Sequence, residues 1–170
     1  FPTDTKLQKK IIEKVRAIAD KEGIQLRQSY RRTLKQLMID QRFREHPKRK
    51  KKAKAAARKI HTIAGRVVRD IERKMTPGQK KQYHDELLVF NLVLGQKRDG
   101  QDKIYSLHEI EVKCIAKGKE ARKYEFGNKT SIVKTSTSGI IVGAMAFSEN
   151  LYDGDTLEPQ LEQVKRLIGK

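Results

Sequence analysis

Residues 48–75 read KRKKKAKAAARKIHTIAGRVVRDIERKM, and this stretch decides the fold of the first half of the chain. Its apolar side chains recur every three or four residues, which is the period of one face of an α-helix. That face is made of Ala56, Ile60, Ile63, Val67, Ile71 and Met75. We therefore predict one long helix whose apolar face is buried and whose first turns carry a run of Lys and Arg.

The same spacing predicts three more helices around the long one. Thr3 or Asp4 can cap the first, which Gly23 ends. The second extends to Pro47, and the last begins after a Thr-Pro-Gly stop at residues 76–78 and closes at Gly95. Their inward residues are Leu7, Ile11, Val15 and Ile18; then Leu26, Tyr30, Leu34, Leu37 and Met38; then Tyr83, Leu87, Phe90 and Leu94. Four antiparallel helices joined by short turns form a bundle.

Beyond a polar stretch at residues 96–103, the pattern changes from helical to strand-like. Short segments rich in β-branched or aromatic residues favour strands. They cover residues 104–107, 112–115, 123–126, 130–135 and 139–147, with a hairpin turn at 135–139. The apolar run that follows Gly139 predicts a strand buried on both faces or nearly so.

A final helix follows the strands, with Leu157, Leu161, Val164 and Ile168 predicted to face inward. The predicted fold class is α+β. Residues 1–98 form a basic four-helix part, and residues 99–170 form a partial sheet with one covering helix.

The net positive charge of the chain is confined to the first of these parts. Residues 1–98 hold 28 Lys and Arg against 10 Asp and Glu, a balance of +18, whereas residues 99–170 hold 11 against 11. Such an asymmetry favours contact with a polyanion, because neutralising phosphates releases counterions. Only ten residues are aromatic, so base stacking is poorly supported. Double-stranded DNA is the expected partner.

The candidate DNA-binding residues are basic side chains on the second helix and on the first turns of the long one. A run such as residues 48–54 could also be a nuclear-localisation patch or a solvated helix start. The repetition of basic residues through the first three helices favours direct phosphate contact. The set is Arg27, Arg31, Arg32, Arg42, Arg44, Lys48, Arg49, Lys50, Lys51, Lys52, Lys54, Arg58 and Lys59.

Several other classes of protein fit the sequence poorly. The longest apolar runs are far shorter than the roughly 20 residues of a membrane span, so no membrane partner is expected. The single cysteine, Cys114, excludes an internal disulfide and indicates a reducing cytoplasm; its apolar surroundings predict that it is buried. The four histidines lack the spacing of a zinc site.

Two carboxylates need separate consideration. Asp153 and Asp155 could hold magnesium for phosphodiester cleavage, since oxygen ligands suit that ion. They also precede a helical segment, where acidic side chains cap free amides and favour the helix dipole. The capping interpretation is favoured.

Eight motifs along the chain resemble the bacterial insertion-sequence transposases of the DDE class. In the second half these are KIYSLHE (103–109), CIAKGK (114–119), KYEFGNK (123–129), GIIVG (139–143) and NLYDG (150–154), followed by Thr156-Leu157. In the first half they are FPTDTKL (1–7), LRQSY (26–30) and IAGR (63–66). The resemblance covers essentially the whole chain.

This resemblance implies an RNase H-like catalytic domain interrupted by a helical insertion. The family cuts and rejoins DNA at transposon ends with two divalent metals, implied here to be Mg²⁺, held by two Asp and one Glu. The first Asp of the pattern would precede Phe1, and the second lies in an Asp-x-Gly-Tyr pattern that this sequence lacks. The resemblance assigns no catalytic role to Asp153, and Asp155 stands where the pattern often has His.

The expectation is therefore an internal fragment lying between the first and second catalytic Asp. Such a fragment would bind DNA but be inactive alone, with no metal bound, and a homodimer is a possible state of the full-length protein. A non-enzymatic nucleic-acid-binding protein is the alternative, and a folded remnant without present function is a third.

Overall fold

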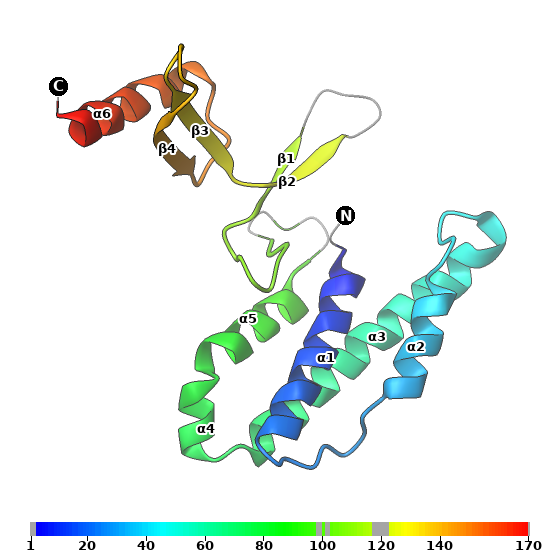
Figure 1. Cartoon of the computed structure of the whole chain (residues 1–170). Coiled ribbons are helices and arrows are strands. Elements are labelled where there is room, and N and C mark those ends of the chain that lie inside the picture. The colour runs from blue at the N-terminus through cyan, green and yellow to red at the C-terminus, as the bar shows by residue number, and fades with distance from the viewer. Residues whose placement is uncertain (1–2, 98–99, 101–102, 117–122, 170) are drawn as a thin grey trace. The chain divides into compact units, whose positions relative to one another are not determined.

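The computed structural model describes residues 3–97, 100, 103–116 and 123–169 and has an α+β fold. It divides into two compact units, Phe1–His108 and Glu109–Lys170 (Figure 1). The division lies ten residues beyond the predicted boundary at 98/99. Ile104 explains the difference, because it is only 7% exposed and packs into the helical core. Its amide donates to the Gln96 side chain over 3.1 Å. The strand predicted at 104–107 is therefore wrong.

The first unit is built on the long helix α3 (Pro47–Lys74), as the sequence predicts. Helix α1 (Asp4–Lys21) packs along it and begins at Thr3, whose hydroxyl accepts from the Lys6 amide. The apolar stripe of α3 is buried, and Ile60, Val68 and Ile71 have no exposed surface. Burial of these aliphatic side chains supplies the main stabilising term of the unit.

Helix α2 (Arg31–Asp40) is shorter than predicted. Tyr30 has a left-handed backbone (φ 52°), a conformation that a helix cannot contain, so the helix starts only after it. Leu26 and Tyr30 therefore belong to the preceding loop, although both pack against the core as predicted. At the other end the helix stops at Asp40 instead of continuing toward Pro47.

The fourth predicted helix is two helices, α4 (Pro77–Gln82) and α5 (His84–Gly95), so the first unit has five helices among its described residues. Thr76 caps α4 as predicted: its hydroxyl accepts from the Gln79 amide, and its own amide donates to the Gln79 side chain. The break falls at Tyr83, whose buried ring places its hydroxyl to donate to Glu22 over 2.6 Å. This hydrogen bond lowers the pKa of Glu22 and raises that of Tyr83.

The two ends of the helical unit lie together. The side chain of Gln96, just beyond α5, donates to Asp4 over 2.8 Å at the start of α1. Lys103 bonds the other oxygen of the same carboxylate at 3.1 Å. The segment that leaves the helices is therefore attached to the segment that enters them.

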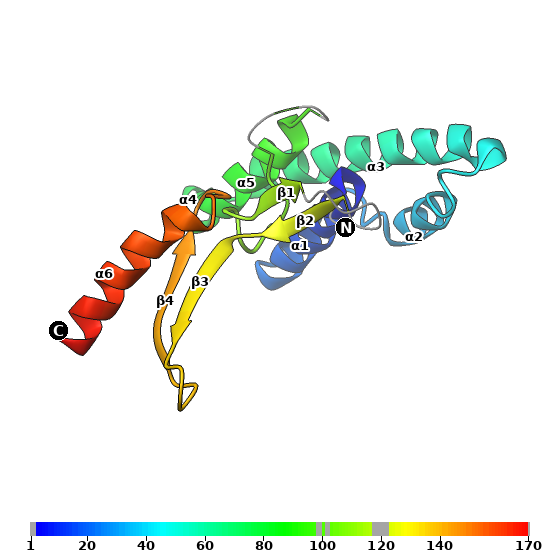
Figure 2. The same cartoon turned by 90° about the horizontal axis from the view of Figure 1, so that it is seen from above.

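The described part of the second unit contains two separate antiparallel pairs of strands. Strand β1 (Lys113–Ala116) pairs with β2 (Tyr124–Gly127), and β3 (Lys129–Lys134) pairs with β4 (Ile141–Phe147). The turn of the second hairpin lies at the predicted Thr-Ser segment. Helix α6 (Leu157–Ile168) packs on β4 and β3 (Figure 2). The partial sheet with one covering helix is present, but as two sheets of two strands.

Gly143 of β4 makes the contact between sheet and helix possible. A Cβ atom there would lie 2.7 Å from Val164 Cγ2 and 2.8 Å from Gln160 Nε2. Gln160 is 1% exposed and donates to Gln163, which in turn donates to the Ala144 carbonyl over 2.9 Å. Gln160, Gln163 and Val164 thus pack against β4 at Gly143.

Three predictions of burial in the second unit are wrong. Ile141 is 62% exposed, so β4 is not buried on both faces. Leu157, Leu161 and Ile168 are 57%, 44% and 50% exposed, because α6 turns Gln160 and Val164 toward the sheet instead. Cys114 is exposed as well. For Ile141 and α6 the reason is that two strands with one helix on them leave their other faces uncovered, and Cys114 lies on the separate pair β1 and β2.

Candidate nucleic-acid interface

A groove of about 920 Å³ between α1 and α2 collects basic side chains. Its floor includes Leu34, Met38 and Ile39. Its walls contain seven basic residues, Lys6, Lys9, Arg16, Arg31, Lys35, Arg42 and Arg44, and one carboxylate, Glu13. Lys9 pairs with Glu13 at 3.1 Å, so the groove keeps a strong positive excess.

Three of the predicted residues, Arg31, Arg42 and Arg44, meet in this groove. Two of them have carboxylate neighbours, since Arg31 lies 3.7 Å from Asp20 and Arg44 lies 3.0 Å from Glu45. Both pairs are exposed, and such pairs hold the side chains only weakly. The groove therefore offers cations that an incoming polyanion can recruit.

The contribution of α1 to the groove was missed. Lys6, Lys9 and Arg16 lie on the face of α1 opposite its apolar stripe, together with Glu13. Their spacing of three and four residues is a signal that the sequence carries. The Nε atom of Arg16 is shielded from solvent and has no hydrogen-bond partner among the described residues.

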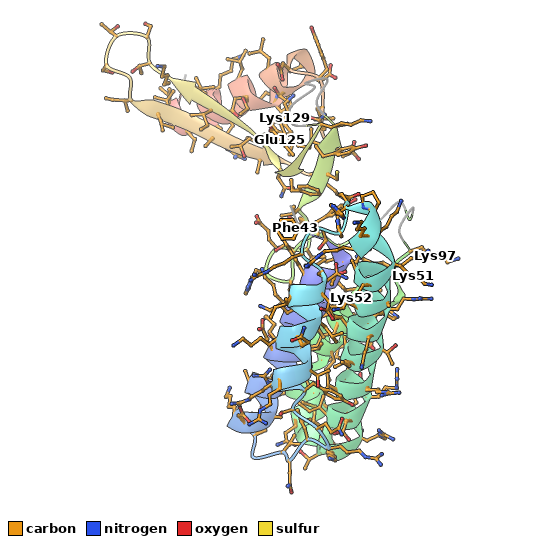
Figure 3. All side chains as sticks on the ribbon, turned by 90° about the vertical axis from the view of Figure 1, so that its right-hand side faces the viewer. Phe43, Lys51, Lys52, Lys97, Glu125 and Lys129 are labelled. Atoms are coloured by element: carbon orange, nitrogen blue, oxygen red, sulfur yellow. The ribbon has the colours of Figure 1, made fainter. Side chains whose placement is uncertain are left out.

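The tip where α2 meets α3 carries the basic run 48–52 (Figure 3). Pro47 is the first residue of α3, and its first turn has no acidic residue and no side-chain cap. All five side chains of the run are exposed. Phe43, in a left-handed conformation (φ 56°), is 74% exposed, and the Arg49 guanidinium lies 5.8 Å from its ring centre.

The placement of this run works against the stability of α3. The N-terminus of a helix is its positive end, where each cation costs a few tenths of a kcal/mol. Lys48, Arg49, Lys50 and Lys51 make no ion pair with any carboxylate that the structure describes. Only Lys52 is paired, to Asp40 at 2.9 Å, and it lowers the pKa of that carboxyl group. Positive charge is thus concentrated at the start of α3, where the binding of an external anion is favoured.

The remaining predicted residues are spread over neighbouring surface. Lys51, Lys54 and Arg58 lie three and four residues apart and share the outward face of α3, and Lys59 is beside them. Arg32 is exposed on α2 and lines none of the cavities described for the helical unit. Arg27 lies in the loop before α2 and lines a different cavity, with Arg66 and Arg69.

Asp153 of the second unit is paired with a lysine. Its carboxylate accepts from Lys129 of β3 at 2.6 Å, and this contact lowers the pKa of Asp153. Asp153 stands at the N-cap position of η1 (Gly154–Thr156) and Asp155 in its first turn, but neither side chain makes a capping hydrogen bond to η1 or to α6. Within the described part of the chain, no three His, Cys, Asp or Glu side chains converge as metal ligands would.

Membrane insertion finds no support in the helices that the structure describes, as none is both long and apolar enough to span a bilayer. Comparison of the chain with protein-family models, with curated proteins and with solved structures gives no match.

Proposed function

We propose that the helical unit binds double-stranded DNA through its phosphate backbone. The observation that carries this proposal is the run 48–52 on the first turns of α3, where four of five cations have no described carboxylate partner. The helix dipole and the side chains have the same sign there, so a phosphate gains from both.

The groove between α1 and α2 supports the same proposal. Three of its basic side chains, Lys9, Arg31 and Arg44, make exposed ion pairs, and such pairs cost little to break. Lys and Arg side chains that meet phosphates position the duplex without reading its bases. Binding is therefore expected to depend little on base sequence.

Salt titration of DNA binding tests this proposal. A surface that neutralises about six phosphates loses on the order of 10³-fold in affinity between about 50 and 200 mM salt. We expect a linear fall of the logarithm of affinity with the logarithm of salt concentration, for duplexes of unrelated sequence alike. Affinity that is unchanged over this range would contradict the proposal.

We further propose that this DNA binding serves a DDE transposase, and that the chain lies between the first and second catalytic Asp of that enzyme. The motifs described above support this context. The bonds from Gln96 and Lys103 to Asp4 support a helical insertion, since a unit inserted into a host domain needs its two ends close together. On this proposal the hairpins and α6 are part of an RNase H-like layer.

The described residues do not fit the magnesium site of such an enzyme. Lys129 forms an ion pair with Asp153, and no group of carboxylates that could hold a metal ion includes Asp153 among the residues that the structure covers. We expect DNA binding without magnesium-dependent strand cleavage. Nicking that disappears in Asp153→Asn would contradict this assignment, and a preference for RNA over duplex DNA would favour the non-enzymatic alternative.

A further inference from the structure

A second cavity lies about 15 residues along α3 from the basic tip, a distance of roughly 22 Å at 1.5 Å per residue. It measures about 410 Å³ and lies between the loop before α2 and the second half of α3. Four arginines line it, Arg27, Arg66, Arg69 and Arg73, together with one carboxylate, Asp70. Of these, only Arg27 belongs to the predicted set.

The fold brings these arginines together in two ways. Arg66, Arg69 and Arg73 are three and four residues apart, so they share one face of α3. Arg27 is far away in sequence, and two bonds hold its loop to the helix. Its amide donates to Asp70 over 2.7 Å, and Lys74 donates to the Gln25 carbonyl over 2.6 Å.

The only carboxylate of the cavity is already engaged. Asp70 accepts the Arg27 amide and lies 3.4 Å from Lys74 and 4.0 Å from Arg73. No described carboxylate pairs with Arg66 or Arg69. The cavity therefore holds an excess of positive charge on planar groups that match the oxygens of a phosphate in pairs.

Gly65 provides the space for one of these groups. A Cβ atom at Gly65 would lie 3.1 Å from Nη1 of Arg69, so the guanidinium folds back over the bare backbone of the helix. Glycine in a helix interior destabilises the helix relative to alanine. This cost falls at the position where a side chain would press on the arginine.

We propose that this arginine pocket is a phosphate-binding site. Its ligand is one phosphate group, which can come from the backbone of DNA or from a free phosphate. The proposal concerns a site separate from the basic tip and does not require that the tip binds DNA.

Titration of the whole chain with inorganic phosphate, by calorimetry at constant ionic strength, tests the pocket directly. We expect saturable binding to one site, and a loss of at least tenfold in affinity for Arg66→Gln with Arg69→Gln. The matched control is Lys80→Gln with Lys81→Gln, which removes the same charge from exposed positions on α4 and is expected to change affinity less than twofold. Equal losses in both variants, or no saturable binding by the wild type, would overturn the proposal.

A charge-preserving variant separates geometry from charge. Arg66→Lys with Arg69→Lys keeps both charges and loses the planar donor pairs, and we expect it to recover only part of the phosphate affinity. Full recovery of the phosphate affinity would show that positive charge alone is sufficient, without the planar donor pairs of arginine, and would also overturn the proposal.

Duplex DNA then identifies the source of the phosphate. If the pocket holds a backbone phosphate, the Gln pair lowers the slope of log affinity against log salt by about 1, and the Lys80 and Lys81 control does so less. An unchanged slope with phosphate binding lost assigns the pocket to a free phosphate. Failure of the wild-type chain to bind duplex DNA would contradict the proposed function, whereas the phosphate titration would still test the pocket.

Discussion

Gly143 shows how much of the second unit depends on one missing methyl group. A Cβ atom at position 143 would lie too close to Val164 and Gln160 for α6 to keep its present place on β4. Large apolar side chains elsewhere in the unit are exposed, so little buried apolar area holds α6 against β3 and β4.

Gly143→Ala is expected to destabilise the second unit by about 1–3 kcal/mol, because the new methyl group must displace α6. Hydrogen exchange of the β4 and α6 amides measures the effect. Gly127→Ala in β2 is the matched control, since nothing lies within 4 Å of a Cβ atom there. If both variants exchange alike, the contact between Gly143 and α6 is not what holds the helix.

Asp70 links the loop before α2 to α3 and makes the first unit sensitive to acid. The Arg27 amide is the main cause of its lowered pKa, followed by Lys74. A carboxyl group whose pKa is lower in the folded than in the unfolded state stabilises the fold above its ordinary pKa of about 4. This contribution is lost as the pH falls from there through the lowered folded pKa.

Asp70→Asn is expected to cost about 1 kcal/mol of unfolding free energy at neutral pH. The difference from the wild type should shrink as the pH falls below about 4, because the wild-type carboxylate is then protonated as well. Denaturant unfolding measured across that range provides the test. Asp20→Asn removes an exposed carboxylate 3.7 Å from Arg31 and should have little effect at any pH. A constant difference at all pH values would contradict the assignment.

At the scale of an element, α3 combines a stabilising half with a costly one. From Ala53 onward it buries a continuous apolar stripe, and before that it carries five cations at its positive pole. Substitution in the apolar half is therefore expected to lower the stability of α3, and replacement of the cations is expected to raise it.

Replacing Lys48, Arg49, Lys50 and Lys51 by Gln is expected to weaken DNA binding for all sequences and to raise the melting temperature. The stability gain is a few tenths of a kcal/mol per residue, because the cations oppose the helix dipole. Lys52 is left in place, since it holds Asp40. Fluorescence anisotropy and thermal unfolding measure the two effects.

The control for this variant changes Lys48, Lys50 and Lys51 to Arg, which preserves the charge and should preserve both properties. Unchanged DNA affinity in the Gln variant would move the contact to another part of the helical unit. A fall in melting temperature would show that the run stabilises α3 in a way that the dipole argument omits.

How far the sequence predicts these elements depends on how strongly burial repeats along them. The stripe of α3 repeats over six positions and predicted its helix closely. Tyr30 and Tyr83 fit the apolar spacing of a helix, and their rings pack in or against the core as that spacing predicts. Their backbones nonetheless leave the helix. Periodicity reports the buried face and is blind to such breaks.

The candidate site follows the same logic. The basic run was visible as composition, and its residues are exposed as expected. The contacts of these residues were not visible, because the Lys52 side chain meets Asp40 and the Arg27 backbone amide meets Asp70 only through tertiary contacts. The pocket of Arg66, Arg69 and Arg73 was missed because its residues alternate with the core positions of α3 and look like an ordinary solvated face.

At the scale of the whole molecule, the two units differ in how they are stabilised. The described apolar residues that are fully or nearly buried all belong to the helical unit. In the second unit the described buried residues are Gly143, Thr156 and Gln160. Burial of apolar area drives folding, so the first unit should carry most of the stability.

Hydrogen exchange of the intact chain should therefore separate the units. Amides of α1, α3 and α5 are expected to exchange only through global opening, at least 100-fold more slowly than those of β1 to β4 and α6. Exchange measured by mass spectrometry in the absence of DNA gives the comparison. Equal protection in both units would show that the hairpins have support beyond the contacts described.

The closure of the helical unit at Asp4 has a mechanical consequence. A pull on its two flanking segments would act together on the contacts of Gln96 and Lys103 with Asp4 and on the buried side chain of Ile104. A unit whose two ends lie together is expected to tolerate insertion into a surface loop of another protein without straining that protein, and here such an insertion would add a basic surface.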